Sequence, residues 1–432
     1  MFVCENIAVG ADGRLRFAGQ SVRALAEEYG TPLYLMDEDR ICHNCRVYLD
    51  AFRRCFRPGS VPLYASKANA FRRIYQIMAE EGMGIDVVSV GEIYTAARAG
   101  FDMAQAYFHG NNKTPEDIAF AMEQGVGWIV IDCAGELEAV EAEAARRGIR
   151  QKALLRITPG IDPHTYEAVA TGKVDSKFGT PIETGQAENL LLQTLQCSHM
   201  ELTGFHCHVG SQVFGEDVFE RTAEVMLRFM AEMCARHGYV AEQLDLGGGY
   251  GVRYADADPA LDIGAKIESV AQTIHGLCEA LDYPEPMILM EPGRSIVADA
   301  GMTVYRVGSV RQIPGFKNYI SVDGGMSDNP RYALYGSKYT VLLEACPERA
   351  GEKRWDVVGR CCESGDILQP NVALPEPDCG ELLAVCTTGA YNYSMASNYN
   401  RIPRPPIVML HGGESYLAVK RETLDDLIRL DV

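Results

Sequence analysis

Short apolar segments alternate with amphipathic segments through the middle of the chain. Eight of the apolar segments have the length and the composition of buried strands. They are residues 63–66, 84–88, 106–109, 128–131, 153–157, 202–208, 243–246 and 287–290. Strands that alternate with helices predict a parallel sheet with right-handed crossovers. Eight such units in succession predict an α/β fold of the TIM-like (β/α)8 barrel type.

Three of the segments between these strands carry clear helix signals. Residues 114–124 begin with a Thr-Pro pair, which places a capping residue before a proline in the first helical position. Residues 135–147 are rich in Ala and Glu and are followed by a glycine. Residues 217–237 form a long amphipathic stretch that also ends at a glycine. These helices occupy the positions that a barrel requires between its strands.

After Gly293 the pattern changes to short strands separated by Gly, Pro and Asp turns. Clear examples are residues 303–313, 319–322, 355–358 and 382–386. Helices are scarce here, so this part is expected to be a separate, mostly β domain. We expect the chain to divide into an N-terminal segment that joins the β-domain through a strand at 13–17, the barrel and the C-terminal β-domain. The expected bounds are 1–30, 31–292 and 293–432.

Composition and charge narrow the class of protein. The 432 residues are 47% hydrophobic and carry a net charge of -19, which repels phosphate backbones and argues against nucleic-acid binding. The 14 cysteines do not indicate a disulfide scaffold in a chain of this length. No apolar run approaches the ~20 residues of a membrane span, and the N-terminus lacks a signal-peptide pattern. We therefore expect a cytoplasmic protein with reduced thiols and no nucleic-acid or membrane partner.

Lys67 directly follows the first predicted barrel strand. The carboxyl ends of barrel strands face the active site. A lysine that emerges there from an apolar strand is desolvated, which favours the neutral amine that forms Schiff bases. Taken alone, a lysine that merely ends a strand is the commoner case.

Two other strand ends carry residues suited to anions. Gly248 and Gly249 follow the strand at 243–246, and glycines there let backbone amides turn toward an anion. Glu291 and Arg294 flank a Pro-Gly turn after the last barrel strand, and barrels often bind phosphate with the loops after strands seven and eight. The plainer alternatives are a tight loop and a local ion pair. The glycines do not form the GxGxxG pattern of a dinucleotide site.

His206 and His208 lie two residues apart and therefore face the same side of their predicted strand. Two such histidines could ligate zinc, but a third ligand is not evident, so we expect no metal ion. An aromatic ring at a cofactor site can instead stack on a planar ring.

The β-domain offers two further groups of candidate residues. Arg331 and Tyr335 lie four apart, so they would face one way on a helical turn and could grip a carboxylate together. A solvated turn is the plainer alternative for this pair. Cys362 is followed closely by Glu363 and Asp366, which makes that loop chemically suggestive.

Taken together, these segments resemble the group IV, alanine-racemase-like decarboxylases that use pyridoxal phosphate, and within that family the branch that acts on diaminopimelate. The likeness runs in one order from about residue 31 to residue 405. It rests on residues 64–69, 86–92, 108–113, 158–165, 176–179, 206–212, 245–251, 291–296, 323–328, 362–366 and 389–401. So many ordered matches are more specific than any one of them.

The resemblance implies a cofactor site on the barrel. Lys67 would bind pyridoxal 5'-phosphate covalently, and Asp86 would line the pocket. His208 would stack on the pyridine ring, and Glu291 would keep the ring nitrogen protonated, which makes the ring an electron sink. The phosphate would be bound by Ser211, Gly248, Gly249, Gly293, Arg294 and Tyr391.

The resemblance also implies a substrate site for a small amino acid. Cys362 and Glu363 would come from the partner subunit of a head-to-tail homodimer with shared active sites. Glu363 would meet the distal ammonium of the substrate, and Cys362 would give a proton to the carbanion after CO2 leaves. Arg294 could serve the phosphate instead of the substrate. The distal carboxylate would be bound by Arg294, Arg331, Tyr335 and Tyr391.

The implied reaction is decarboxylation of meso-2,6-diaminopimelate to L-lysine and CO2, the last step of lysine biosynthesis. Other decarboxylases of this class act on ornithine, arginine or carboxynorspermidine. Ornithine and arginine lack the far carboxylate, so Arg331 and Tyr335 favour diaminopimelate. A racemase, a non-catalytic cofactor-binding protein and a metal-dependent barrel hydrolase are the remaining alternatives. The chain departs from the family pattern, without loss of a candidate catalytic group, at Val90, Tyr166, Tyr332 and Arg360.

Overall fold

The computed structural model describes residues 2–161, 176–215, 217–349 and 351–432. Tyr166 and the last part of the family-like segment at 158–165 lie outside the described residues. The chain divides into two compact units. The barrel unit comprises Asn44–Gly251 and Leu261–Gly293. The β-rich unit comprises Met1–His43, Val252–Ala260 and Arg294–Val432.

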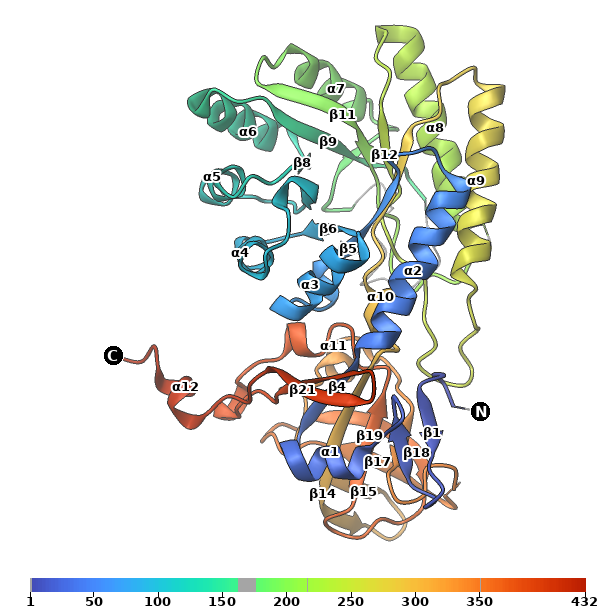
Figure 1. The fold of residues 1–432 in the computed structure, drawn as a ribbon, viewed down its shortest axis with the longest axis vertical. Coiled ribbons are helices and arrows are strands. Elements are labelled where there is room, and N and C mark those ends of the chain that lie inside the picture. The colour runs from blue at the N-terminus through green and yellow to red at the C-terminus, as the bar shows by residue number, and fades with distance from the viewer. Residues whose placement is uncertain (1, 162–175, 216, 350) are drawn as a thin grey trace. The chain divides into compact units, whose positions relative to one another are not determined.

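Among the described residues of the barrel unit, eight parallel strands close into a ring (Figure 1). In chain order they are β5 (Val61–Ala65), β6 (Gly84–Val87), β7 (Ala106–Phe108), β8 (Trp128–Ile131), β9 (Gln151–Thr158), β11 (Met200–His206), β12 (Gln243–Asp245) and β13 (Met287–Met290). The ring closes where β13 pairs with β5. A short strand, β10 (Thr180–Pro181), pairs with β9 outside the ring. Each of the eight predicted segments forms a strand, which confirms the predicted barrel.

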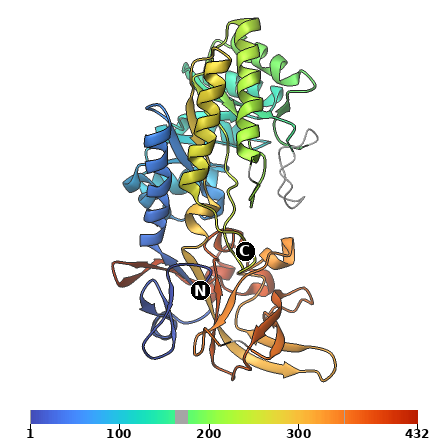
Figure 2. The same ribbon diagram turned by 90° about the vertical axis from the view of Figure 1, so that its right-hand side faces the viewer.

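Helices follow the strands along the chain. Those of the barrel unit are α3 (Arg72–Glu81), α4 (Val90–Ala99), α5 (Pro115–Glu123), α6 (Ala134–Arg147), α7 (Gln186–Gln196), α8 (Val218–His237) and α9 (Ile263–Ala280). The three helices predicted from sequence are α5, α6 and α8. Thr114 forms a capping box at the start of α5, and Gly148 ends α6 in the left-handed conformation. Helices α8 and α9 lie side by side in both views (Figures 1 and 2).

Strands dominate the β-rich unit, with β14 (Gly301–Gln312) at its centre. This strand pairs with β4 (Leu33–Asp37), β15 (Asn318–Val322) and β19 (Leu382–Cys386). The other strands are β16 (Val341–Leu343), β17 (Lys353–Val358), β18 (Ile367–Leu374), β20 (Ile407–His411) and β21 (Glu414–Val419). The helices are α1 (Val22–Tyr29), α10 (Arg294–Val297), α11 (Arg331–Tyr335) and α12 (Leu424–Ile428), and α2 (Glu38–Cys55) begins in this unit. The four strands predicted after Gly293 are therefore present, as β14, β15, β17 and β19.

The N-terminal part of the chain contributes two kinds of strand. The predicted strand at 13–17 is β2 (Leu15–Phe17), which pairs with β1 (Ile7–Val9) and β3 (Gln20–Ser21) in a sheet of three. Strand β4 instead pairs with both β14 and β20, and these hydrogen bonds tie residues 31–43 to the β-rich unit. The division of the structure thus differs from the expected one, which assigned residues after 30 to the barrel.

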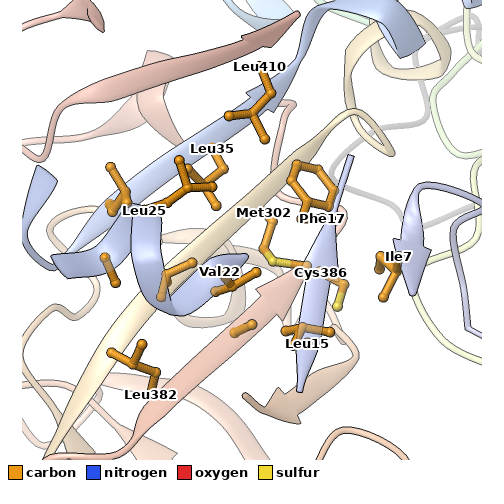
Figure 3. Close-up of a cluster of buried hydrophobic side chains, with 14 of the residues drawn as sticks. Ile7, Leu15, Phe17, Val22, Leu25, Leu35, Met302, Leu382, Cys386 and Leu410 are labelled. Atoms are coloured by element: carbon orange, nitrogen blue, oxygen red, sulfur yellow. The ribbon is translucent and has the colours of Figure 1, made fainter. Parts of the chain in front are cut away.

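A large apolar core holds these pieces of the β-rich unit together. Figure 3 shows side chains from the N-terminal segment, among them Leu15, Phe17 and Val22, packed with Met302 and Leu382 from later strands. All five are at most 2% exposed. Burial of each such side chain stabilises the fold by about 1.5–3 kcal/mol relative to exposure. None of the helices in the described part of the chain has both the length and the apolar character needed to cross a membrane.

Candidate functional site

The carboxyl ends of the barrel strands gather titratable side chains. Because parallel strands of a barrel end at one rim, residues that follow different strands are brought together there. Lys67 lies in the 3₁₀ turn η1 (Ser66–Ala68) that follows β5. The buried side chains at this rim, which we call the carboxylate–imidazole cluster, are Asp86 of β6, His109 after β7, His206 of β11, Asp245 of β12 and Glu291 after β13.

Short distances connect the members of this cluster. Lys67 Nζ lies 3.5 Å from Asp86 Oδ2. His109 Nε2 lies 3.8 Å from Asp86 Oδ1 and 2.9 Å from Glu291 Oε1. His206 Nε2 lies 3.2 Å from the same Glu291 oxygen. The two imidazole rings meet edge to face, with centroids 4.8 Å apart. Glu291 is therefore held between two imidazoles.

Burial and contact between neighbours shift the pKa values of the cluster members in different directions. Burial alone would raise the pKa of Glu291, but His109 and His206 beside it bring that pKa well below its ordinary value. Burial raises the pKa of Asp245 well above its ordinary value, and the nearby Glu291 raises it further. Burial lowers the pKa of His206 to about 3. At neutral pH Glu291 is thus ionised and His206 is neutral, whereas burial favours the protonated form of Asp245.

His208 is oriented by the glycine loop after β12. Burial lowers the pKa of His208 well below its ordinary value, so the ring is neutral. The Gly248 amide donates a hydrogen bond to His208 Nδ1 at 3.2 Å, which leaves the ring proton on Nε2. This amide N–H is therefore directed to a histidine in the structure, although the sequence suggested that it faces a phosphate.

The glycines of this loop are required by close packing. A Cβ atom at Gly248 would lie 2.0 Å from the Glu291 carbonyl oxygen, and one at Gly249 would lie 2.0 Å from the Gly210 carbonyl oxygen. A Cβ atom at Gly293 would lie 2.9 Å from the Ala65 Cβ atom. Any larger residue would push apart the loops that carry the cluster.

The cluster fits pyridoxal phosphate on chemical grounds. Within the described part of the chain, Glu291 Oε1, both Asp86 carboxylate oxygens and both His206 ring nitrogens are buried without an aligned hydrogen-bond partner. Buried polar atoms of this kind require partners. A protonated ring nitrogen can satisfy an ionised carboxylate, and Lys67 offers an amine beside Asp86. The donor set therefore suits a polar heterocycle that carries an aldehyde.

The same side chains also meet the geometric requirements of a metal site. Potential ligand atoms of His109, His206, Asp245 and Glu291 all lie within 4.8 Å of one another. From the sequence, no third ligand was evident beside His206 and His208; in the structure His206 lies with three other potential ligands, and the expectation of no metal ion stays a prediction. Two imidazoles and two carboxylates form a donor set that zinc accepts.

The β-rich unit gathers a second group of charged and aromatic side chains, which we call the arginine–tyrosine cluster. The guanidinium carbon of Arg294 lies 4.7 Å from the ring centroid of Tyr391, and that of Arg331 lies 5.2 Å from the same centroid. Arg331 also lies 5.2 Å from the Tyr335 ring, as their spacing on one helical turn predicts. Tyr254 completes the cluster, because Arg294 Nη1 donates to its hydroxyl oxygen at 2.6 Å.

Cys362 and Glu363 are exposed on a loop that Asp366 fixes. The Asp366 carboxylate accepts hydrogen bonds from the Met326 amide at 2.6 Å and from the Cys361 amide at 2.7 Å. The loop therefore has a defined shape, and its two candidate residues point to solvent in the single chain.

Sequence reasoning missed three members of the two clusters. His109 and Asp245 lie at the ends of predicted barrel strands, the same signal that pointed to His206 and Glu291. Tyr254 had no comparable signal, because it lies in an irregular segment between a strand and a helix. Of the departures from the family pattern, Val90 opens α4, Tyr332 lies in α11 and Arg360 precedes the cysteine loop.

Comparison with known proteins agrees with this chemistry. A family model described as "Pyridoxal-dependent decarboxylase, pyridoxal binding domain" matches residues 39–298. A diaminopimelate decarboxylase of Bacillus subtilis is 43% identical over 100% of this chain and 98% of its own length. One from Staphylococcus aureus is 40% identical over 98% of this chain and 99% of its own length.

Solved structures lead to the same family. The crystal structure of diaminopimelate decarboxylase from M. jannaschii in complex with L-lysine superposes with a TM-score of 0.91. It is 32% identical in sequence and covers 100% of this chain and 99% of that chain. Both the sequence and the fold therefore match over the full length. The chain belongs to the pyridoxal-dependent decarboxylases and, within them, to the diaminopimelate decarboxylase family.

Proposed function

We propose that this chain uses pyridoxal 5'-phosphate to remove CO2 from meso-2,6-diaminopimelate and so produces L-lysine, the last step of lysine biosynthesis. The observation that carries the choice of substrate is the pair of buried arginines, Arg294 and Arg331, on one tyrosine ring. A second carboxylate is what distinguishes diaminopimelate from ornithine and arginine. A site that leaves buried guanidinium groups unpaired rejects such substrates strongly.

The carboxylate–imidazole cluster is the proposed cofactor site. When bound, the cofactor withdraws electrons from the substrate carbon that loses CO2. Lys67 would bind the cofactor, and Asp86 beside its amine would help to set that amine's charge. Glu291, ionised between its two imidazoles, would hold a proton on the ring nitrogen. His208, neutral and oriented by Gly248, would stack on the ring.

The remaining cofactor contacts stay predictions. Ser211 lies in the loop after β11, Gly249 lies in the loop after β12, and Gly293 precedes Arg294 on the chain. We propose that they bind the phosphate, together with Tyr391. Gly248 is a weaker candidate because its amide already donates to His208.

The arginine–tyrosine cluster is the proposed site for the distal carboxylate. Arg331 and Tyr335 would bind it directly, and Arg294, which lies over the same Tyr391 ring, would join them. Glu363 would meet the distal ammonium, and Cys362 would return a proton after CO2 leaves. Both would act in the active site of the partner subunit, so the protein would be an obligate homodimer. A cytoplasmic location also stays a prediction.

The experiment that tests this function is parallel measurement of CO2 release, with pyridoxal phosphate supplied, from meso-diaminopimelate, ornithine, arginine and lysine. We expect release from diaminopimelate alone. Release from ornithine or arginine would keep the cofactor chemistry but contradict the role given to Arg331 and Tyr335. Release from none of them would contradict the proposed function and favour a racemase or a cofactor carrier.

A further inference from the structure

Tyr254 is held rigidly by the rest of the β-rich unit. Its backbone amide donates to Asp258 Oδ2 at 2.9 Å. Its carbonyl oxygen accepts hydrogen bonds from Thr340, at 3.0 Å from the amide and 2.9 Å from the hydroxyl. Its ring meets the Tyr339 ring edge to face, with centroids 5.1 Å apart. Only 7% of the residue is exposed, so the position of its hydroxyl is fixed from several sides.

This hydroxyl is one of the groups that bind Arg294. Arg294 is 6% exposed, and its Nη1 atom donates to the Tyr254 hydroxyl at 2.6 Å. The guanidinium carbon of Arg294 also lies over the Tyr391 ring, 4.7 Å from its centroid. A planar guanidinium that is bonded at one edge and stacked on one face has a defined orientation. Tyr254 supplies the edge contact and Tyr391 the face contact.

Arg331 marks where a ligand is needed. The residue is 7% exposed, and no carboxylate of the described residues lies within ion-pair distance of it. Its Nε atom is buried without a hydrogen-bond partner in the described part of the chain, and its contact with Ser337 Oγ is long, at 3.4 Å. A buried guanidinium in this state requires an anion. Arg294 and Arg331 both lie over the Tyr391 ring, so the two guanidinium groups belong to one cluster.

We propose that Tyr254 is a positioning residue for substrate specificity. Its phenol fixes Arg294 so that Arg294 and Arg331 together bind the distal carboxylate of the substrate. This inference rests on the proposed function and adds a residue that acts through Arg294 rather than on the ligand. It also assigns Arg294 to the substrate carboxylate instead of the cofactor phosphate.

The test compares two small molecules that differ by one carboxylate. L-Lysine retains the distal carboxylate of diaminopimelate, whereas cadaverine has the same amines and lacks it. Their dissociation constants would be measured by the change in cofactor absorbance, for the holoenzyme and for Tyr254→Phe. The phenylalanine keeps the ring contacts with Tyr339 and removes only the hydroxyl. Because a hydrogen bond to a charged group is lost, we expect lysine to bind roughly tenfold more weakly, or worse, and cadaverine to bind unchanged.

Kinetics should show the same selectivity. In Tyr254→Phe the KM for diaminopimelate should rise by a similar factor while kcat falls little, because the reacting carbon is untouched. Asp258→Ala provides a second variant, since it loosens the segment that carries Tyr254 without changing any member of the cluster. Tyr29→Phe is the matched control, because it removes a phenol that bonds Ser415 instead. It should leave all of these constants unchanged.

Several results would overturn the inference. Equal weakening of lysine and cadaverine in Tyr254→Phe would show a general structural effect. Weaker binding of pyridoxal phosphate, with unchanged lysine selectivity, would assign Arg294 to the phosphate. A wild-type protein that binds cadaverine as tightly as lysine would contradict the carboxylate site itself. If the wild-type protein released no CO2 from diaminopimelate, the proposed function would fail, but the comparison of lysine with cadaverine would still decide the role of Tyr254.

Discussion

The two units of this chain bury clusters of opposite character. The carboxylate–imidazole cluster holds three carboxyl groups and two imidazoles, and its two imidazoles lower the pKa of Glu291 so that this carboxyl group is ionised. The arginine–tyrosine cluster holds two guanidinium groups among phenol rings. An acidic cluster suits a cationic ring nitrogen, and a basic cluster suits a carboxylate. The contrast shows that one chain can build two buried clusters of opposite charge, each within its own unit.

The clusters differ also in how the backbone builds them. Every member of the barrel cluster lies in or directly after a strand, so the regular geometry of the ring places it. Members of the other cluster come from short helices and irregular segments, which are held by hydrogen bonds such as those of Tyr254 and Thr340. Substitutions that change charge should therefore affect the function of the carboxylate–imidazole cluster most. Substitutions that change the orientation of a side chain should affect the function of the arginine–tyrosine cluster most.

The largest effect is expected from substitution of Lys67. This residue lies in the barrel unit, and we propose that it binds the cofactor covalently. Lys67→Ala should lose the absorbance of the covalently bound cofactor and almost all turnover, because it removes the amine that lies beside Asp86 at the rim of the barrel. Absorbance spectra and CO2 release would be measured together. Lys152→Ala, which changes an exposed lysine of β9, is the control and should behave like the wild type. Retained turnover in Lys67→Ala would exclude Lys67 as the attachment point.

Removal of the charge of Glu291 should have the next largest effect on turnover. Glu291→Gln keeps the shape of the side chain but removes the charge, so turnover should fall roughly a hundredfold to a thousandfold. Asp245→Asn is the matched control. Burial and the neighbouring Glu291 raise the pKa of Asp245 well above its ordinary value and so favour its uncharged form, and its substitution should therefore cost far less. Equal losses in the two variants would contradict the assignment of the charge to Glu291.

Substitution of Cys362 tests the role of a thiol that belongs to neither cluster. Cys362→Ala should retain the bound cofactor and lose roughly a hundredfold in turnover, the size of a typical proton-transfer contribution. The exposed Cys379 offers a control, because Cys379→Ala removes a thiol of similar accessibility. Turnover that is unchanged in Cys362→Ala would remove this thiol as the proton donor.

The smallest effect is the contribution of His206 in the carboxylate–imidazole cluster to the pH dependence of the free energy of unfolding. The pKa of His206 falls to about 3 in the folded chain, so below its unfolded value of about 6.5 only the unfolded chain gains this proton. Stability from the neutral imidazole is therefore full above the unfolded pKa and falls as pH decreases toward the folded pKa. In the apoprotein, lowering the pH from about 7.5 to about 5.5 should cost about 1 kcal/mol through this residue.

Urea unfolding of the wild type and His206→Asn at both pH values would isolate this contribution from other titrating groups. The stability difference between the two proteins should shrink by that amount at the lower pH. A constant difference would show that His206 is not held neutral.

Sequence reasoning reached much of the barrel and less of the β-rich unit, for physical reasons. Apolar runs of strand length and helix caps are local signals, and they located every barrel strand. Lys67 and Glu291 stood out because they follow such strands directly. Strand β4 has the same apolar pattern, but its partners β14 and β20 lie hundreds of residues later, and no local pattern reveals such pairing. The role of Tyr254 could not be predicted from the sequence for the same reason, since it depends on contacts with Thr340 and Arg294.

The pairing of β4 with β14 has a consequence for synthesis of the chain on the ribosome. Strand β4 emerges early, but β14, which must lie beside it, is made only after the whole barrel segment. Barrel strands can pair with neighbours that have just emerged, whereas β4 must wait with an open edge. A nascent chain stopped after Gly293 would hold a barrel segment of full length and an N-terminal strand without its partner. Such a stalled product should be a preferred substrate for chaperones and proteases.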